Sequence, residues 1–236
     1  MRRIVAGAAC IAMLLVPIAG AHAAPIVGQV DTFEDGTTQG WVINLRGMGA
    51  PPPETLPANV PTGGPGGVDD NFLQLTSVGG NVAGGRLTAI NLGQWAGDYL
   101  SAGVNAISMD LRNLGTSDLR IRLFLENPMG GPPTAGAVTN EVLLPAGGGW
   151  TRATFGVDAA SLTTLFGDLN TLLSNVTALR IFHAGDAAPP TFPGPPIAGQ
   201  LGIDNITALA SVPEPVGLTL LGLAAASVLV WRRPAR

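Results

Sequence analysis

The side chains best suited to binding a ligand are polar residues on short apolar segments, together with a few tryptophans. The candidates are Asp110, Arg122, Arg180, His183, Trp41 and Trp150. A polar group beside a flat aromatic face suits a sugar, whose ring face is apolar and whose edge carries hydroxyl groups. Aromatic residues make up only 5% of the chain, which weakens this prediction. Salt bridges, sheet surfaces and core packing are alternative roles for each candidate.

Catalytic signatures are absent from the sequence. His183 is the only histidine in residues 24–211, so a zinc site with several histidines is excluded and a Ser-His-Asp triad would depend on this one residue. The single cysteine, Cys10, lies in the N-terminal apolar run, which excludes a thiol nucleophile from the body. A carboxylate pair stays open as an alternative, but we expect a protein that is not an enzyme.

The charge of the body limits its partners. Residues 24–211 contain 7 arginines and no lysine against 15 acidic residues, a net charge of −8. Such an acidic body argues against nucleic acid as a partner.

The N-terminus has the three parts of a secretory signal peptide. Arg2 and Arg3 precede an apolar run from Ile4 to Ala19, and Ala21-His22-Ala23 supplies the small residues that signal peptidase recognises. We expect a signal helix over residues 1–23 and cleavage between Ala23 and Ala24. An uncleaved anchor is the alternative.

The C-terminus predicts a single transmembrane helix of marginal length. Residues 216–231 carry no charge and are followed by an arginine-rich end, Arg232 to Arg236. A helix of this length spans roughly 24 Å, less than the ~30 Å hydrocarbon core. The arginines would stay in the cytoplasm and the body outside.

An extended segment, Val212-Pro213-Glu214-Pro215, precedes this span, because the two prolines cannot enter a helix interior. With the apolar span and the terminal arginines, residues 212–236 closely resemble the PEP-CTERM sorting signal of Gram-negative bacteria. The resemblance implies recognition by an exosortase, removal of the tail after transient anchoring in the inner membrane, and delivery to the outer surface or the exterior. An ordinary C-terminal anchor is the alternative.

The body, residues 24–211, is expected to be a single all-β domain. The whole chain contains 33 glycines and 20 prolines, a composition that suits short strands joined by tight turns. Alternating apolar residues predict strands at Asp31–Glu34, Trp41–Asn44, Asn71–Val78, Gly85–Leu92, Ala106–Asn113, Leu119–Glu126, Asn140–Leu144, Trp150–Val157, Thr177–Ala184 and Leu201–Leu209. A hairpin is expected at 114–118, with Asp110 and Arg112 facing Arg120 and Arg122 across it. Leucines at helical spacing from Leu162 to Leu173 predict one short helix that covers an end of a jelly-roll β-sandwich, with Gly167 as a possible break.

Two short motifs add a second resemblance. The segments Thr32 to Trp41 and Gly202 to Ile206 resemble jelly-roll domains of the galactose-binding and carbohydrate-binding-module type. In many such domains a structural calcium ion joins the first and last strands, and the matching side chains here are Glu34 and Asp204. Carboxylates and carbonyls are the ligands that Ca²⁺ prefers, although carboxylates at strand ends also cap turns.

These observations predict an exported, non-catalytic protein associated with an extracellular matrix or exopolysaccharide, with signal peptidase and exosortase as processing partners. A carbohydrate-binding, lectin-like module is the first alternative, and a glycan hydrolase is the second.

Overall fold

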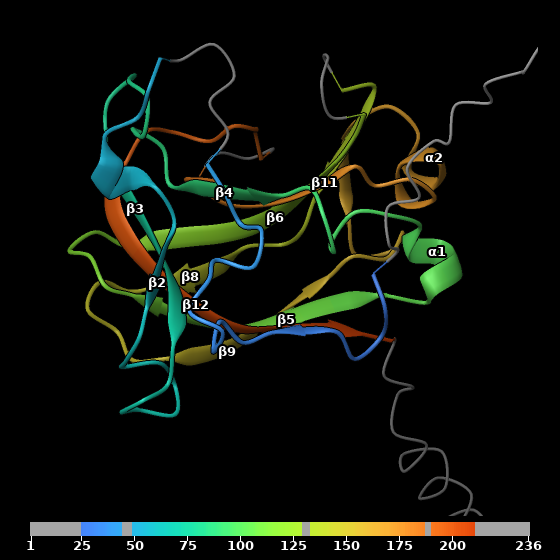
Figure 1. Cartoon of the computed structure of the whole chain (residues 1–236). Coiled ribbons are helices and arrows are strands. Elements are labelled where there is room, and N and C mark those ends of the chain that lie inside the picture. Colours follow the sequence, from blue (N-terminus) through green and yellow to red (C-terminus); the bar gives the residue numbers. More distant parts are fainter. Residues whose placement is uncertain (1–24, 44–48, 129–132, 187–189, 211–236) are drawn as a thin grey trace, which may run out of the picture.

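The computed structural model describes residues 25–43, 49–128, 133–186 and 190–210. Two antiparallel sheets pack face to face (Figure 1). The β12 sheet has the order β2 (Ala58–Val60), β3 (Phe72–Val78), β12 (Ala198–Leu209), β5 (Ala106–Asn113) and β9 (Thr151–Gly156), with β1 (Val30–Asp31) also paired to β12. The β6 sheet has the order β10 (Thr163–Phe166), β7 (Ala135–Val138), β6 (Leu119–Asn127), β11 (Ala178–His183) and β4 (Thr88–Asn91), with β8 (Val142–Leu144) also paired to β6.

The core between the sheets follows from the alternation of side chains along the strands. In β5, Ile107, Met109 and Leu111 have no exposed surface, while Asp110 and Arg112 lie on the outer face. In β6, Leu119, Ile121, Leu123 and Leu125 are likewise buried in the core. Because successive strand residues point to opposite faces, each sheet has one apolar inner face. The predicted all-β sandwich is confirmed.

The segment 114–118 is not the hairpin that the sequence predicted. It joins β5 in the β12 sheet to β6 in the β6 sheet, so the two strands belong to different layers. Asp110 therefore pairs with Arg152 of β9, with 3.1 Å between Oδ2 and Nη1, whereas Arg120 and Arg122 share Glu141. A hairpin within one sheet and a connection between two sheets have the same alternation of side chains. The residues of the turn do not show which sheet the following strand joins.

The helix expected between Leu162 and Leu173 is wrong in its first half. Thr163–Phe166 forms β10 and pairs with β7, and only Leu169–Leu173 is helical, as α2. Gly167 separates them with a φ of +76°, and a Cβ there would lie 2.3 Å from the carbonyl oxygen of Thr134. A carboxylate cap starts α2, since Asp168 Oδ1 accepts a hydrogen bond from the Thr171 N–H at 2.7 Å.

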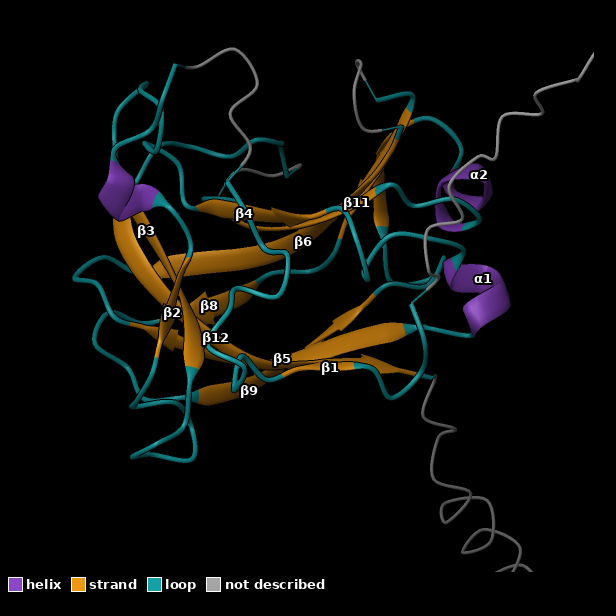
Figure 2. Ribbon diagram, viewed as in Figure 1, coloured by secondary structure: helices purple, strands orange, loops and turns teal. Residues whose placement is uncertain are grey.

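Short helices cover the ends of the sandwich. Figure 2 shows α1 (Tyr99–Ala102) and α2 at one end, where Gly97 and Val176 form a β-bridge between the adjoining loops. A 3₁₀ helix, Pro53–Thr55, precedes β2. No helix among the described residues is long and apolar enough to cross a membrane. The predicted signal helix and the predicted span at 216–231 lie outside these residues.

Candidate functional site

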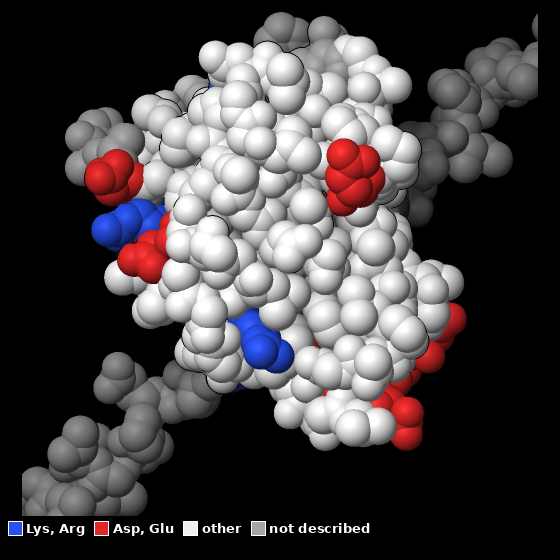
Figure 3. Space-filling model, turned by 90° about the vertical axis from the view of Figure 1, so that its left-hand side faces the viewer, with Lys and Arg blue, Asp and Glu red and all other residues white. Residues whose placement is uncertain are grey.

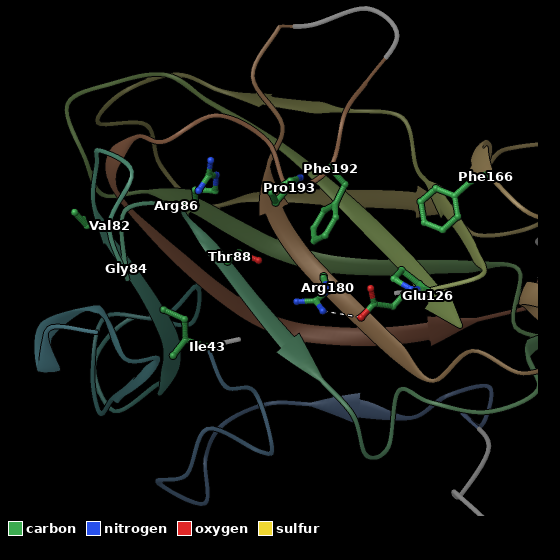
Figure 4. A pocket seen from close by; sticks show the side chains of 11 residues that line it. Ile43, Val82, Gly84, Arg86, Thr88, Glu126, Phe166, Arg180, Phe192 and Pro193 are labelled. Carbon is green, nitrogen blue, oxygen red and sulfur yellow. Dashed lines mark hydrogen bonds and ion pairs between the residues drawn. The ribbon is translucent and has the colours of Figure 1, made fainter. Parts of the chain in front are cut away.

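A groove opens on the outer face of the β6 sheet. Its volume is about 490 Å³ and its walls are mostly apolar. The residues that line it are Ile43, Val82, Gly84, Arg86, Thr88, Glu126, Pro133, Phe166, Arg180, Phe192 and Pro193 (Figure 4). They come from β4, β6, β10 and β11 and from the loops beside these strands, so the groove depends on the completed sheet.

An ion pair forms part of the groove floor. Arg180 of β11 and Glu126 of β6 both point outward from the sheet, and Arg180 Nη2 lies 2.6 Å from Glu126 Oε1 (Figure 4). The two residues are only 3% and 1% exposed. Each charge is therefore neutralised by the other in a site largely removed from water.

The loop after β11 brings a ring onto this floor. The Phe192 ring stacks on Phe124 with 4.1 Å between the ring centroids, and the guanidinium carbon of Arg180 lies 5.2 Å from the centroid of Phe192. Phe182 meets the same ring edge to face. Phe124, Phe182 and Phe192 thus belong to a second apolar cluster, on the outer side of the sheet.

A partly exposed ring stands at one end of the groove. Phe166 of β10 is 39% exposed, although it lies beside Phe124. Gly136 on the neighbouring β7 leaves the space for both rings, because a Cβ there would lie 2.6 Å from Phe166 and 2.8 Å from Phe124. An exposed aromatic face in an apolar groove is the feature that sugar rings stack on.

Polar groups on the β4 side complete the groove. Arg86 Nε donates a hydrogen bond to the Gly194 carbonyl oxygen at 2.9 Å. The Thr88 hydroxyl is buried and has no hydrogen-bond partner within the described part of the chain. Residues two apart on an extended segment share a face, and both Arg86 and Thr88 line the groove.

The groove combines apolar surfaces with a few hydrogen-bond donors and acceptors, which suits it to binding a ligand. Glycoside hydrolysis normally needs two carboxyl groups across the scissile bond. Among the described groove residues Glu126 is the single acid, and it is tied to Arg180.

The residues predicted to bind a ligand are divided between the two sheets. On the β6 sheet, Arg180 lies in the groove, whereas Arg122 donates to the Thr139 carbonyl oxygen and pairs with Glu141. His183 is 7% exposed, and its Nδ1 accepts a hydrogen bond from the Arg120 N–H at 3.0 Å. Burial, reinforced by the charge of Arg120, lowers the pKa of His183. This histidine is therefore a neutral structural acceptor.

Trp41 cannot act as a platform because none of its surface is exposed. Its Nε1 donates to Asp31 Oδ2 at 2.8 Å, and Trp95 Nε1 donates to the same oxygen at 2.7 Å. The predicted binding residue is thus part of a buried polar network that fixes the first strand.

Asp110 and Trp150 lie on the outer face of the β12 sheet, away from the groove. Asp110 Oδ2 accepts from Arg152 and Asn205 at 3.1 and 3.0 Å. The half-buried Trp150 donates from Nε1 to the Gly63 carbonyl oxygen and packs edge to face on Phe72. Both side chains therefore make their hydrogen bonds and packing contacts on the side of the β12 sheet.

The two predicted calcium ligands belong to an acidic region of the β12 sheet. Glu34 Oε1 accepts from the Asn71 N–H at 3.0 Å, and Asp204 is 1% exposed. Burial is the main cause that raises the pKa of Asp204 to about 7; the charges of Asp70, Asp110 and Glu34 also raise it, whereas the hydrogen bond from the Asn205 N–H lowers it. No group of three or more acidic, histidine or cysteine side chains is placed to hold a metal ion in the described ranges. A calcium ion here would need backbone carbonyls as additional ligands.

Sequence reasoning missed most of the groove. Phe166 lies within the segment predicted to be a helix, and Phe192 lies in none of the predicted strands or helices. Arg86, Thr88 and Glu126 had no pattern to distinguish them, because they come together only through the pairing of β4, β11 and β6. The outward position of Glu126 on its strand was the one available signal.

Comparisons with known proteins bear on the fold. No family model matches the chain, and no curated protein matches its sequence. The solution structure of the carbohydrate-binding module CtCBM11 has a TM-score of 0.50 at 16% identity, over 83% of this chain and 100% of the module. The family 11 module from Clostridium thermocellum, solved with a β-1,3-1,4-mixed-linked tetrasaccharide, has a TM-score of 0.49 at 15% identity, over 80% and 99%.

An exo-β-agarase is also similar, with a TM-score of 0.52 at 12% identity, over 80% of this chain and 26% of the agarase. At such identities the similarity shows the fold alone. The chain has the jelly-roll β-sandwich that is found in carbohydrate-binding modules.

Proposed function

We propose that this chain is an exported, non-catalytic protein that binds polysaccharide outside the cell through the groove on the β6 sheet. The observation that carries the proposal is the groove itself, where the exposed ring of Phe166 and the buried hydroxyl of Thr88 line one cavity. The fold shared with CtCBM11, a carbohydrate-binding module, supports it. Binding is favoured over hydrolysis because the groove offers one neutralised acid.

The proposal predicts a specific loss of glycan binding. The Phe166→Ala variant should bind its glycan about tenfold or more weakly, because the stacking surface is lost while the ring is exposed enough for the fold to tolerate its removal. Isothermal titration with oligosaccharides of mixed-linked glucan, agarose, xylan and polygalacturonate measures this. Trp150→Ala, on the other sheet, is the matched control and should bind like the parent. Equal affinity of the Phe166 variant and the parent would contradict the proposed site.

Export and sorting are also proposals, supported by residues 1–24 and 212–236, which lie outside the described residues. We propose that signal peptidase removes residues 1–23 and that an exosortase removes the tail at Val212-Pro213-Glu214-Pro215 after transient anchoring. Intact-mass analysis of the protein recovered from its host should show a chain that begins at Ala24 and ends near Pro213. A mass that includes residues 216–236 in a host with an active exosortase would contradict sorting.

We propose a structural calcium ion at Glu34 and Asp204. The chemistry of these residues fits a cation, because a buried carboxylate surrounded by Asp70, Asp110 and Glu34 has an excess of negative charge that no described arginine fully offsets. Bound calcium would tie the start of the body to β12 and favour the ionised form of Asp204.

This proposal predicts how stability depends on pH. The folded pKa of Asp204, about 7, lies above the ordinary value of 3.8, so its stabilising contribution is complete at low pH and is lost as pH rises through 7. In EDTA, the free energy of unfolding should therefore be about 2 kcal/mol higher near pH 5 than near pH 8. Calcium should restore stability near pH 8, and Asp204→Asn should remove both effects. Thermal unfolding with and without calcium checks this, and melting curves that calcium leaves unchanged would exclude the ion.

A further inference from the structure

The groove has a positive charge that no carboxylate of the described residues compensates. None of the ion pairs between described residues includes Arg86. Its Nε donates to the Gly194 carbonyl oxygen, and its Nη2 lies 3.4 Å from Asn81 Oδ1. Both partners are neutral. Arg86 is also only partly buried, and a guanidinium has five N–H donors, so donors remain for a ligand.

The other charged residues that line the groove do not change its net charge. Glu126 and Arg180 neutralise each other, which leaves the groove with a net charge of +1. The body as a whole has a net charge of −8, from 7 arginines and 15 acidic residues. On the face drawn in Figure 3, charged side chains are few and most of the surface is uncharged. The net charge of the groove is therefore opposite in sign to the net charge of the body.

The arrangement also has the shape of an extended binding site. Figure 4 shows Phe166 and Arg86 at opposite ends of the groove, with Phe192 between them. Thr88 lies between Arg86 and Arg180 in the same view, and its buried hydroxyl lacks a partner among the described residues. An oligosaccharide lying along this groove would stack one ring on phenylalanine and present another to the guanidinium.

We propose that the groove takes an anionic glycan, whose carboxylate or sulfate group accepts hydrogen bonds from Arg86 while an apolar sugar face packs on Phe166 or Phe192. This inference rests on the proposed function and adds the class of ligand. A hydrogen bond between ionised groups is stronger than a neutral one, and in a mostly apolar groove it is screened less than at an open surface. An otherwise acidic protein repels polyanions, so Arg86 confers selectivity on the one site where they are accepted.

Paired glycans that differ only in charge test the inference. One pair is oligogalacturonate and its methyl ester, which tests carboxylate, and the other is a sulfated galactan oligosaccharide and its desulfated form, which tests sulfate. The charged member of at least one pair should bind about tenfold more tightly than its neutral partner. Its affinity should fall as NaCl is raised, because salt screens the ion pair.

Variants assign this preference to Arg86. In Arg86→Gln the ratio of charged to neutral affinity should fall below about twofold, while Arg86→Lys should keep most of it. Arg112→Gln is the matched control, since Arg112 also lacks an ion pair among the described residues but lies on the outer face of the β12 sheet. Thermal unfolding verifies that each variant folds.

The outcomes separate this inference from the proposed function. Binding of neutral glycans that depends on Phe166, with no preference for charge, would overturn the anionic ligand and leave the proposed function standing. A preference that survives Arg86→Gln would also overturn it. If no glycan binds, the proposed function fails and the inference fails with it.

Discussion

Replacing Asp31 with alanine is expected to lower the free energy of unfolding by about 3 to 5 kcal/mol, enough to unfold a marginal domain. Asp31 is 4% exposed, and its Oδ2 accepts hydrogen bonds from both Trp41 and Trp95 at 2.8 and 2.7 Å. Alanine would leave two fully buried indole N–H groups without an acceptor. Urea unfolding followed by circular dichroism measures the loss.

Asp31→Asn is the control for this prediction. An amide oxygen in the position of Oδ2 keeps both indole hydrogen bonds and removes a carboxylate whose pKa is raised, chiefly by burial. We expect Asn to lose less than half of what Ala loses. If the two variants were equally destabilised, the charge of Asp31 and not its role as an acceptor would be what the core requires.

Glu126→Gln is the second large effect, with an expected loss of about 3 kcal/mol. The change replaces the carboxylate that lies 2.6 Å from the Arg180 guanidinium with a neutral amide, in a site where both residues are almost completely buried. The loss of the negative charge removes the attraction that offsets the desolvation of the buried guanidinium. Chemical denaturation compared with the parent protein measures the difference.

Glu141→Gln is a matched control for the effect of burial. Glu141 Oε1 also lies 2.6 Å from an arginine, Arg120, but both side chains are about one third exposed. We expect a loss of no more than about 1 kcal/mol, because solvent screens this pair. A double variant, Glu126→Leu with Arg180→Met, should recover most of the loss at the buried pair. Similar losses at Glu126 and Glu141 would contradict the account of the groove floor.

The longer strands were predictable because their alternation is local, whereas the short strands β2, β7 and β10 were not predicted. Ala106–Asn113 is observed as predicted, and Leu119–Asn127 differs from the prediction by one residue. The layer to which each strand belongs was not predictable. The short segment 114–118 connects two sheets. The alternation of a sequence shows which side chains share a face of a strand, but it does not show which strands lie beside it.

The helix error has a similar origin. Apolar residues between Leu162 and Leu173 fit helical spacing, yet β10 gains more by pairing with β7 than a short helix gains from local hydrogen bonds. The close approach of Gly167 to Thr134 marks the boundary, and only the folded chain shows that contact. Short amphipathic segments of this kind are decided by tertiary pairing.

Only one of the residues that line the groove was among the predicted ligand-binding residues. Arg180 was a candidate because it is a charge on an apolar strand, and Trp41 was a candidate because tryptophans often bind sugars, but only Arg180 lies in the groove. Phe192 reaches its position through a loop that returns over β11, where Gly194 lies against the carbonyl oxygen of His183. The periodicity of a sequence does not predict the path of such a loop. The aromatic surface was therefore found only in the structure.

Titration of the isotopically labelled protein with the oligosaccharides named above, followed by NMR of backbone amides, tests the central claim most directly. Shift changes centred on Thr88, Glu126, Phe166 and Arg180 of the β6 sheet are the expected result. Changes confined to the surroundings of Trp150 on the β12 sheet, or no change with any oligosaccharide, would contradict it.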